Sequence, residues 1–162
     1  MKIRSCRTID DYHQARSMFR EYADQISTDL CFQNFNEELK IVEQMYSPPA
    51  GELLFAEDLS GNKLGCVAIR KVNETTCELK RMYVRPEFRN QGIGKHLLDS
   101  ALEIAPELGY RKIKLDTLPT MKEAIQIYIS RGFSEISSNL LNPVNGTIYM
   151  ERSLEGFDVT ST

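Results

Sequence analysis

Long apolar runs are missing from this chain. No uncharged hydrophobic stretch approaches the roughly 20 residues that cross a bilayer as a helix, and the basic start Met1–Arg7 is not followed by an apolar segment. We therefore expect neither an export signal nor a membrane-spanning segment, and no membrane partner. The expected location is the cytoplasm.

Cysteine is scarce and unclustered. The four residues Cys6, Cys31, Cys66 and Cys77 form no C-x-x-C pair, the spacing that is typical of zinc sites and redox motifs. Scattered thiols fit a reducing compartment better than a disulfide framework. We expect reduced, inert, partly buried cysteines and no metal ion.

An excess of positive charge is also absent. The 20 Lys and Arg residues are outnumbered by 23 Asp and Glu residues, so the net charge at pH 7 is −3. Binding to nucleic acid depends largely on neutralising phosphates, and we expect no nucleic-acid partner. With 41% hydrophobic and 27% charged residues, the 162-residue chain has the composition of a folded protein. We expect a single domain over residues 1–154 and a flexible tail over residues 155–162.

Hydrophobic periodicity predicts the order of helices and strands. Apolar residues three and four apart predict helices, and alternation of apolar and polar residues predicts strands. Pro48 and Pro49 are expected to end the second helix. The helical patterns cover residues 8–26, 35–46, 93–108 and 124–129, and the strand patterns cover residues 3–7, 53–57, 64–70, 77–84, 112–116, 133–136 and 147–152.

This order of elements predicts a mixed α/β sheet. Three consecutive strands between residues 53 and 84, joined by short polar turns, indicate an antiparallel meander. The strand–helix–strand unit that follows indicates a parallel, right-handed crossover, with helices on both faces of the sheet. In open α/β sheets, ligands bind where neighbouring strands diverge at such a changeover.

The turn from Arg89 to Lys95 has the composition of an anion site. It joins a predicted strand to a predicted helix, so backbone N–H groups at the positive end of the helix can face a ligand. Gly92 and Gly94 lack the Cβ that would block the approach of a phosphate. The side chains of Arg89 and Lys95 add positive charge. The alternative is a plain surface loop before a well-formed helix.

Two nucleotide-binding motifs do not fit this turn. A dinucleotide fingerprint would require a third glycine where Leu97 stands. A P-loop would require glycine at Arg89 and serine or threonine at His96. Neither motif therefore identifies the anion.

Two segments resemble the GCN5-related N-acetyltransferase (GNAT) superfamily. Residues 78–94, ELKRMYVRPEFRNQGIG, are similar to the family signature, whose R/Q-x-x-G-x-G/A loop binds the pyrophosphate of acetyl-CoA. Residues 124–133, AIQIYISRGF, are similar to the A-x-x-x-Y-x-x-x-G-F segment of the family. One departure is Met121, because many relatives have asparagine three residues before the alanine of this helix. That departure weakens any assignment of a polar cofactor contact there.

The resemblance implies a fold and a co-substrate. The fold is α/β, with a GNAT-like mixed, mostly antiparallel sheet, a splayed central pair of strands and helices on both faces. The co-substrate is acetyl-CoA, with its pantetheine arm paired to a free strand end and its pyrophosphate held by the turn. The cofactor-binding residues so implied are Met82, Tyr83, Val84, Arg89, Asn90, Gln91, Gly92, Ile93, Gly94, Lys95 and Thr117.

Direct acetyl transfer needs a proton acceptor, because a free alkylamine has a pKa of about 10.4 and is charged near neutrality. Glu78 is the candidate base. Strand alternation places it on the same face as Lys80, Met82 and Val84, and the resemblance implies a base-like glutamate at this strand position. The alternative is a surface carboxylate paired with Lys80 or Arg70.

Tyr128 is the candidate general acid. Its position on a helical stripe is typical of a core residue, whereas the resemblance implies that it lies beside the cofactor sulfur and protonates the departing thiolate. No cysteine nucleophile is required, because holding amine and thioester together can supply several kcal/mol of the barrier.

The expected activity is transfer of acetyl to a primary amine of a small molecule or peptide. By resemblance, residues 22–46 and 137–145 build the acceptor pocket, and acidic residues there either indicate a cationic acceptor or form a solvated face. Two other functions stay open: a non-catalytic acyl-CoA-binding sensor or partner module, and an acyltransferase that uses a longer acyl-CoA. A homodimer is also open. The acidic residues in question are Asp24, Asp29, Glu37 and Glu38.

Overall fold

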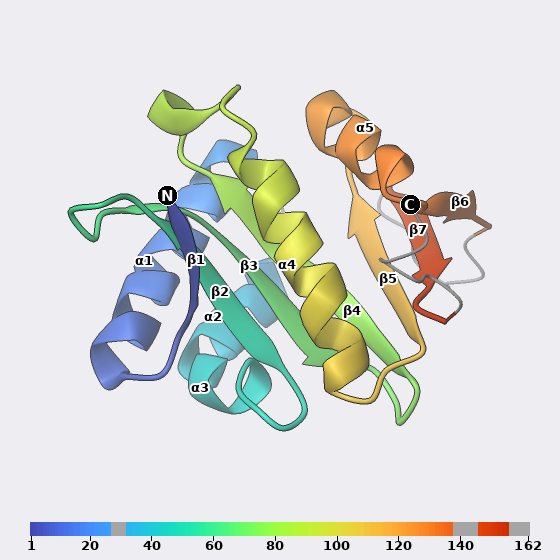
Figure 1. Cartoon of the computed structure of the whole chain (residues 1–162), viewed down its shortest axis with the longest axis horizontal. Helices are drawn as coiled ribbons and strands as arrows, with labels where there is room; N and C mark the ends of the chain where they lie inside the picture. Colours follow the sequence, from blue (N-terminus) through green and yellow to red (C-terminus); the bar gives the residue numbers. More distant parts are fainter. Residues whose placement is uncertain (27–31, 138–145, 156–162) are drawn as a thin grey trace.

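The computed structural model describes residues 1–26, 32–137 and 146–155 (Figure 1). The order of strands and helices agrees with the predicted order. Cys31, Asp29, residues 138–145 of the expected acceptor pocket and residues 156–162 of the expected tail lie outside the described residues. The elements are β1 (Lys2–Ser5), α1 (Ile9–Ile26), α2 (Phe32–Lys40), α3 (Val42–Met45), β2 (Glu52–Glu57), β3 (Lys63–Lys71), β4 (Thr76–Val84), the 3-10 turn η2 (Pro86–Phe88), α4 (Ile93–Glu107), β5 (Lys112–Thr117), α5 (Lys122–Ser130), β6 (Ser134–Ile136) and β7 (Ile148–Ser153).

The strands of the described residues form one seven-stranded sheet in the order β1-β2-β3-β4-β5-β7-β6. β4 and β5 pair in parallel, and every other pair of neighbours is antiparallel. The meander β2-β3-β4 and the crossover β4-α4-β5 are the two units that the sequence predicted. The mixed, mostly antiparallel sheet is confirmed.

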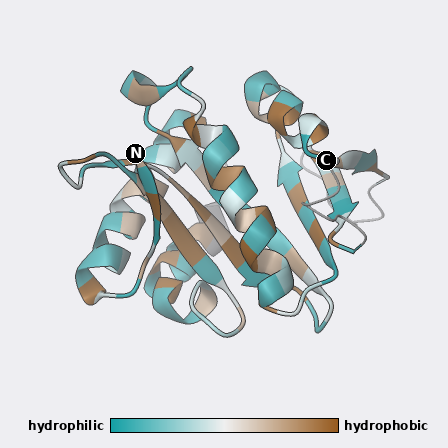
Figure 2. Cartoon of the chain, in the orientation of Figure 1, coloured by the Kyte–Doolittle hydropathy of each residue, from teal (hydrophilic) through white to brown (hydrophobic). Residues whose placement is uncertain are grey.

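Helices cover both faces of the sheet, with α4 and α5 on one side and α1 to α3 on the other (Figure 1). Figure 2 shows the hydrophobic residues concentrated in the central strands between these helices. Two apolar clusters result, because each amphipathic helix buries its apolar stripe against one face. The α4 side contains Val67, Ile69, Leu97, Leu98, Ala101, Ile113 and Leu115, and the α1–α3 side contains Met18, Phe19, Val42, Tyr46, Phe55 and Cys66.

The predicted helix over residues 35–46 is divided in the structure. α2 ends at Lys40, and α3 begins at Val42. Ile41 between them has φ −121° and ψ 25°, outside the helical region. The break leaves Ile41 exposed and keeps both Leu39 and Val42 buried.

The central strands β4 and β5 separate along their length. Their parallel register covers three pairs, from Thr76 opposite Lys112 to Glu78 opposite Lys114. β4 then continues to Val84 and β5 to Thr117 without further pairing to each other. Figure 1 shows the two strands diverging toward the N-terminal end of α4. The predicted splayed central pair is confirmed.

A β-bulge interrupts β4 just beyond this point. Lys80 pairs with Ala68 and Tyr83 pairs with Cys66, so two residues of β4 lie opposite Val67. One of the two is Arg81, whose φ of 56° lies in the left-handed region. An extra residue in one strand bends that strand and exchanges its two faces.

The bulge corrects an expectation for Glu78. Leu79 packs on the α4 side, as do Met82 and Val84 after the bulge. Glu78 and Lys80, the residues on either side of Leu79, therefore face α1–α3. Glu78 pairs in register with Arg70 on that second face. The expectation that Glu78 shares a face with Met82 and Val84 is therefore wrong, because it counted a regular alternation through residue 81.

The three described cysteines, Cys6, Cys66 and Cys77, are buried free thiols. Burial raises the pKa of each, to about 12 for Cys66 and Cys77. A thiol with a raised pKa is a poor nucleophile near neutrality. Among residues 1–26, 32–137 and 146–155, no helix is long and apolar enough to cross a membrane, and no group of His, Cys, Asp and Glu side chains is arranged to hold a metal ion.

Candidate functional site

The turn before α4 places bare backbone at the helix N-terminus. Asn90 and Gly92 both have positive φ, 65° and 80°, and Gly92 is the residue before the first helical residue, Ile93. No side chain caps this end of the helix, so its first N–H groups are available to a ligand. A Cβ added at Gly92 would meet no atom within 4 Å. Gly92 thus borders open space at the positive end of a 15-residue helix.

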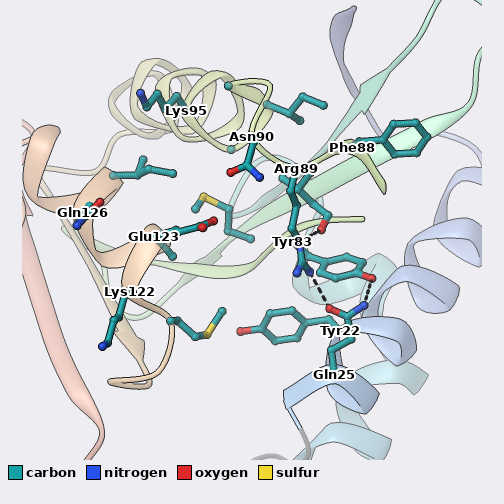
Figure 3. A pocket seen from close by; sticks show the side chains of 18 of the residues that line it. Tyr22, Gln25, Tyr83, Phe88, Arg89, Asn90, Lys95, Lys122, Glu123 and Gln126 are labelled. Carbon is teal, nitrogen blue, oxygen red and sulfur yellow. Dashed lines mark hydrogen bonds between the residues drawn. The ribbon is translucent and has the colours of Figure 1, made fainter. Parts of the chain in front are cut away.

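A cavity of about 1040 Å³ lies beside this turn. Its walls come from four places: the end of β4, the turn and first residues of α4, the segment from Leu118 into α5, and the C-terminal turn of α1. Figure 3 shows the side chains of α5 facing those of α1 and β4 across the cavity. The cavity therefore lies at the divergence of β4 and β5, where the order of elements predicted a ligand.

Most of the implied cofactor-binding residues line this cavity. Gln91 and Thr117 do not line it; Gln91 is exposed on the turn, and Thr117 is buried at the end of β5. The implied residues that do line the cavity are Met82, Tyr83, Val84, Arg89, Asn90, Gly92, Ile93, Gly94 and Lys95.

Arg89 is turned away from the open side of the turn. Its Nε donates to the Val84 carbonyl at 2.9 Å, and its Nη2 donates to Gln25 Oε1 at 2.7 Å. Gln25 in turn donates from Nε2 to the Tyr83 hydroxyl at 3.1 Å (Figure 3). The expected cation of the anion site is held against α1 here, and it occupies the Val84 carbonyl that was expected to pair with pantetheine.

Positive charge at the cavity comes from other side chains as well. Lys95 of α4 and Lys122 of α5 are exposed and lie on the cavity wall (Figure 3). Glu123 is the acidic residue beside them on α5. Lys95 and Lys122 therefore put positive charge on the α4 and α5 walls of the cavity.

The sequence did not predict that α1 forms part of the cavity wall. Tyr22 and Ile26 belong to an apolar stripe that predicted packing alone, yet both line the cavity with Gln25. The Tyr22 ring meets the Tyr83 ring edge-on, with centroids 5.8 Å apart. The sequence of an amphipathic helix does not show whether its whole apolar stripe packs on the sheet or whether the last helical turn extends beyond the end of the sheet.

The sequence also did not predict that the start of α5 lines the cavity. Met121 was noted there only as a departure from the family. Met121 lines the cavity, so the position that many relatives fill with asparagine does face the ligand space in this chain. The other wall residues, to which no individual role was assigned from the sequence, are Phe88, Leu118, Thr120, Lys122, Glu123, Ala124, Gln126, Ile127, Ser130 and Arg131.

The two candidate catalytic residues do not line the cavity. Tyr128 is buried in the α4-side cluster, with its ring 5.7 Å from that of Phe133. Burial raises the pKa of the Tyr128 hydroxyl, and the charges of Tyr22 and Asp116 raise it further. Glu78 accepts a hydrogen bond from Arg70 Nε at 2.7 Å, the pairing that was the alternative to a base role.

Comparison with known proteins gives the same family that the two motifs resemble. Residues 12–133 match the Acetyltransferase (GNAT) family. An uncharacterised N-acetyltransferase of Schizosaccharomyces pombe is 37% identical over 143 residues, 88% of this chain and 86% of the relative. The N-acetylaspartate synthetase of Homo sapiens is 32% identical over 130 residues, 79% of this chain but only 40% of the longer relative.

A solved structure shares the fold. The crystal structure of a GNAT-family acetyltransferase from Staphylococcus aureus superposes with a TM-score of 0.77 at 22% identity, over 95% of this chain and all of the other. The match of residues 12–133 and the 37% identity extend over most of the chain, including the glycine turn, the splayed strands and α5. This chain belongs to the GNAT acetyltransferase family.

Proposed function

We propose that this protein transfers an acetyl group from acetyl-CoA to a primary amine of a small molecule or peptide. The observation that carries the proposal is the uncapped turn at Gly92, which borders open space beside the 1040 Å³ cavity between the splayed strands. Bare N–H groups at a helix N-terminus suit a pyrophosphate. Membership of an acetyltransferase family agrees with this use.

The residues present fit a coenzyme A thioester. The amides of residues 91–95 would hold the pyrophosphate, and Lys95, next to these amides on the cavity wall, would add positive charge there. The backbone of residues 82–84 is unpaired on the β5 side and would pair with the pantetheine arm as a neighbouring strand does. Thr117 would contact the cofactor from the β5 side.

Arg89 must change partners when the ligand binds. Its bond to the Val84 carbonyl competes with pantetheine for the same acceptor. Release of Arg89 from Val84 and Gln25 would free that carbonyl and return the guanidinium to the phosphates. Because the side chain is exposed, this rearrangement needs no change in the core.

The chemistry is a direct attack of the amine on the thioester carbonyl. The N–C bond forms and the C–S bond breaks; the amine proton passes to a base and the thiolate accepts a proton from an acid. We assign Glu78 as the base, acting directly or through water, and Tyr128 as the acid. A hydroxyl with a raised pKa remains protonated until it donates.

The first test is calorimetry of the purified protein with CoA and acetyl-CoA. We expect saturable binding, and no heat of binding at millimolar ligand would overturn the proposal. The second test is thiol release from acetyl-CoA with polyamines, amino acids, aminoglycosides and peptides. Binding without turnover on any acceptor would favour the sensor function. Faster turnover with a longer acyl-CoA would assign a different acyl group.

A further inference from the structure

The side chain of Arg89 connects the end of β4 to the last turn of α1. Its Nε donates to the Val84 carbonyl at 2.9 Å, and its Nη2 donates to Gln25 Oε1 at 2.7 Å. Figure 3 shows the bond to Gln25 as a dashed line between the two elements. All three residues line the cavity. One guanidinium therefore binds two oxygen atoms that belong to different walls of the same cavity.

A second bond fixes the orientation of the Gln25 amide. Gln25 Nε2 donates to the Tyr83 hydroxyl at 3.1 Å, and this hydroxyl donates to Glu21 Oε1 at 3.3 Å. Because a guanidinium can only donate, the amide must present its oxygen to Arg89 and its N–H group to Tyr83. The exchanged orientation would place two donors against each other. Each group from Arg89 to Glu21 therefore donates to the next.

The far end of this series of hydrogen bonds is held in place. Arg85 donates from Nε and Nη2 to the two oxygens of the Glu21 carboxylate at 3.1 and 2.8 Å. Tyr83 is only 4% exposed, and its ring centre lies 5.9 Å from the Arg89 guanidinium. The Gln25 oxygen is therefore a fixed acceptor, whereas the Arg89 side chain that it holds is exposed.

The two bonds of Arg89 compete with a ligand that binds along β4. A pantetheine arm that pairs with residues 82–84 as a neighbouring strand does would donate an N–H group to the Val84 carbonyl. Arg89 Nε already donates to that oxygen. A phosphate group at the glycine turn would in turn attract the guanidinium away from the neutral Gln25 amide. The Arg89–Gln25 contact and acyl-CoA binding therefore oppose each other.

We infer that Gln25 is a positioning residue that lowers the affinity of this protein for acyl-CoA, an inference that rests on the proposed function. Gln25 acts by holding Arg89 at the Val84 carbonyl, not by binding the ligand. If only a fraction of the molecules have Arg89 released, the apparent Kd equals the intrinsic Kd divided by that fraction. Removing Gln25 raises the fraction and tightens binding. Removing a residue that contacts the ligand would have the opposite effect.

The experiment is calorimetry with CoA on the wild type and on Gln25→Ala. The variant is expected to bind CoA about two- to tenfold more tightly, the factor that corresponds to the net contribution of one hydrogen bond. In thiol-release assays its KM for acetyl-CoA should fall by a similar factor, with no rise in kcat. Because Gln25 is exposed, thermal melts should show little change in stability.

Gln126→Ala is the matched control. Gln126 is an exposed residue of α5 that lines the same cavity, on the side opposite Arg89 (Figure 3). Its replacement removes an equal amide but keeps the Arg89–Gln25 contact, so CoA binding should not become tighter. A second control places Gln25→Ala in an Arg89→Met background. Without a guanidinium to hold, the loss of Gln25 should not change the CoA affinity of that background.

The outcomes separate the role of Gln25 from the proposed function. Absence of CoA binding by the wild type would refute the proposed function itself. CoA binding by the wild type, with equal or weaker binding by Gln25→Ala, would refute only the role of Gln25. Equal gains in affinity for Gln25→Ala and Gln126→Ala would also refute it, because added space would then explain the gain. So would a gain that persists in the Arg89→Met background.

Discussion

Replacing Glu38 by alanine is expected to destabilise the fold, because it leaves Arg81 buried without its carboxylate. The two side chains are only 8% and 7% exposed, and Arg81 donates from Nε and Nη2 to the two carboxylate oxygens at 2.9 and 2.7 Å. The guanidinium also lies 5.2 Å from the centre of the Phe35 ring and 5.9 Å from that of Tyr22. Removing one partner of a buried ion pair costs about 3–5 kcal/mol.

The lower end of this range applies here, because Arg81 keeps its two aromatic neighbours when Glu38 is removed. A loss of about 3 kcal/mol corresponds to a fall in Tm of roughly 6–12 °C for a domain of this size. Replacing both partners, as Glu38→Leu with Arg81→Met, should recover most of that loss, because no buried charge remains.

The pH dependence gives a second measurement. Burial alone would raise the pKa of Glu38, but the hydrogen bonds and charge of Arg81 outweigh it and hold the pKa below its ordinary value of 4.5. A lowered pKa in the folded state stabilises the fold above the unfolded pKa, and this stabilisation is lost as pH falls through the folded pKa. The stability difference between the wild type and Glu38→Gln should therefore shrink as pH falls below about 4.5.

Urea unfolding of Glu37→Ala is the control for this prediction. Glu37 is the preceding residue, 70% exposed, and its partner Lys40 lies 3.2 Å away on the surface. Its loss should change the free energy of unfolding by about 0.5 kcal/mol or less. The reasoning fails if Glu38→Ala is no more destabilising than Glu37→Ala, or if the double replacement is as unstable as the single one.

Three further predictions concern the ligand and the chemistry. Gly92→Ala should weaken CoA binding by about tenfold or more in calorimetry. Gly61→Ala is the control, because Gly61 has a similar φ of 84° and also borders open space. Both variants should lose a similar amount of stability, but Gly61→Ala should keep the CoA affinity of the wild type. Tyr128→Phe should reduce kcat by about 100-fold with unchanged CoA affinity, and an unchanged kcat would remove Tyr128 from the mechanism. Glu78→Gln should shift the acidic limb of the pH–rate profile; a profile that superposes on the wild type would exclude Glu78 as the base.

The glycine turn and the order of elements could be predicted because both depend on local sequence. Two glycines at the start of a helix permit a positive-φ turn and the close approach of a ligand, and the apolar periodicities indicate which face of each element is buried. The splay of the central strands was implied by the resemblance to the family. Local reasoning identified Arg89, Gly92, Gly94 and Lys95 of the turn, and the resemblance to the family implied the other wall residues between Met82 and Lys95.

The bulge could not be predicted, and it changed the interpretation of Glu78. The inserted position is occupied by Arg81, a residue with no special preference for positive φ. The apolar alternation does change phase at Lys80 and Arg81, but a change of phase alone does not specify a bulge. The part played by α1 was missed for a related reason. Tyr22 and Gln25 reach the cavity through tertiary packing, which has no signature in the spacing of residues along the helix.

Because β4 contains an inserted residue, the packing on both faces of the sheet depends on the exact number of residues in this strand. Upstream of the inserted residue, odd-numbered side chains point toward α4; downstream, even-numbered ones do so. Removing Arg81 itself would restore a regular strand and leave Met82 facing α4 and Tyr83 facing α1, whereas removing any other single residue of β4 while the bulge is kept would exchange the faces of the residues on one side of the deletion. Each layer would then receive side chains shaped for the other, so substitutions are tolerable along β4 in a way that such deletions are not.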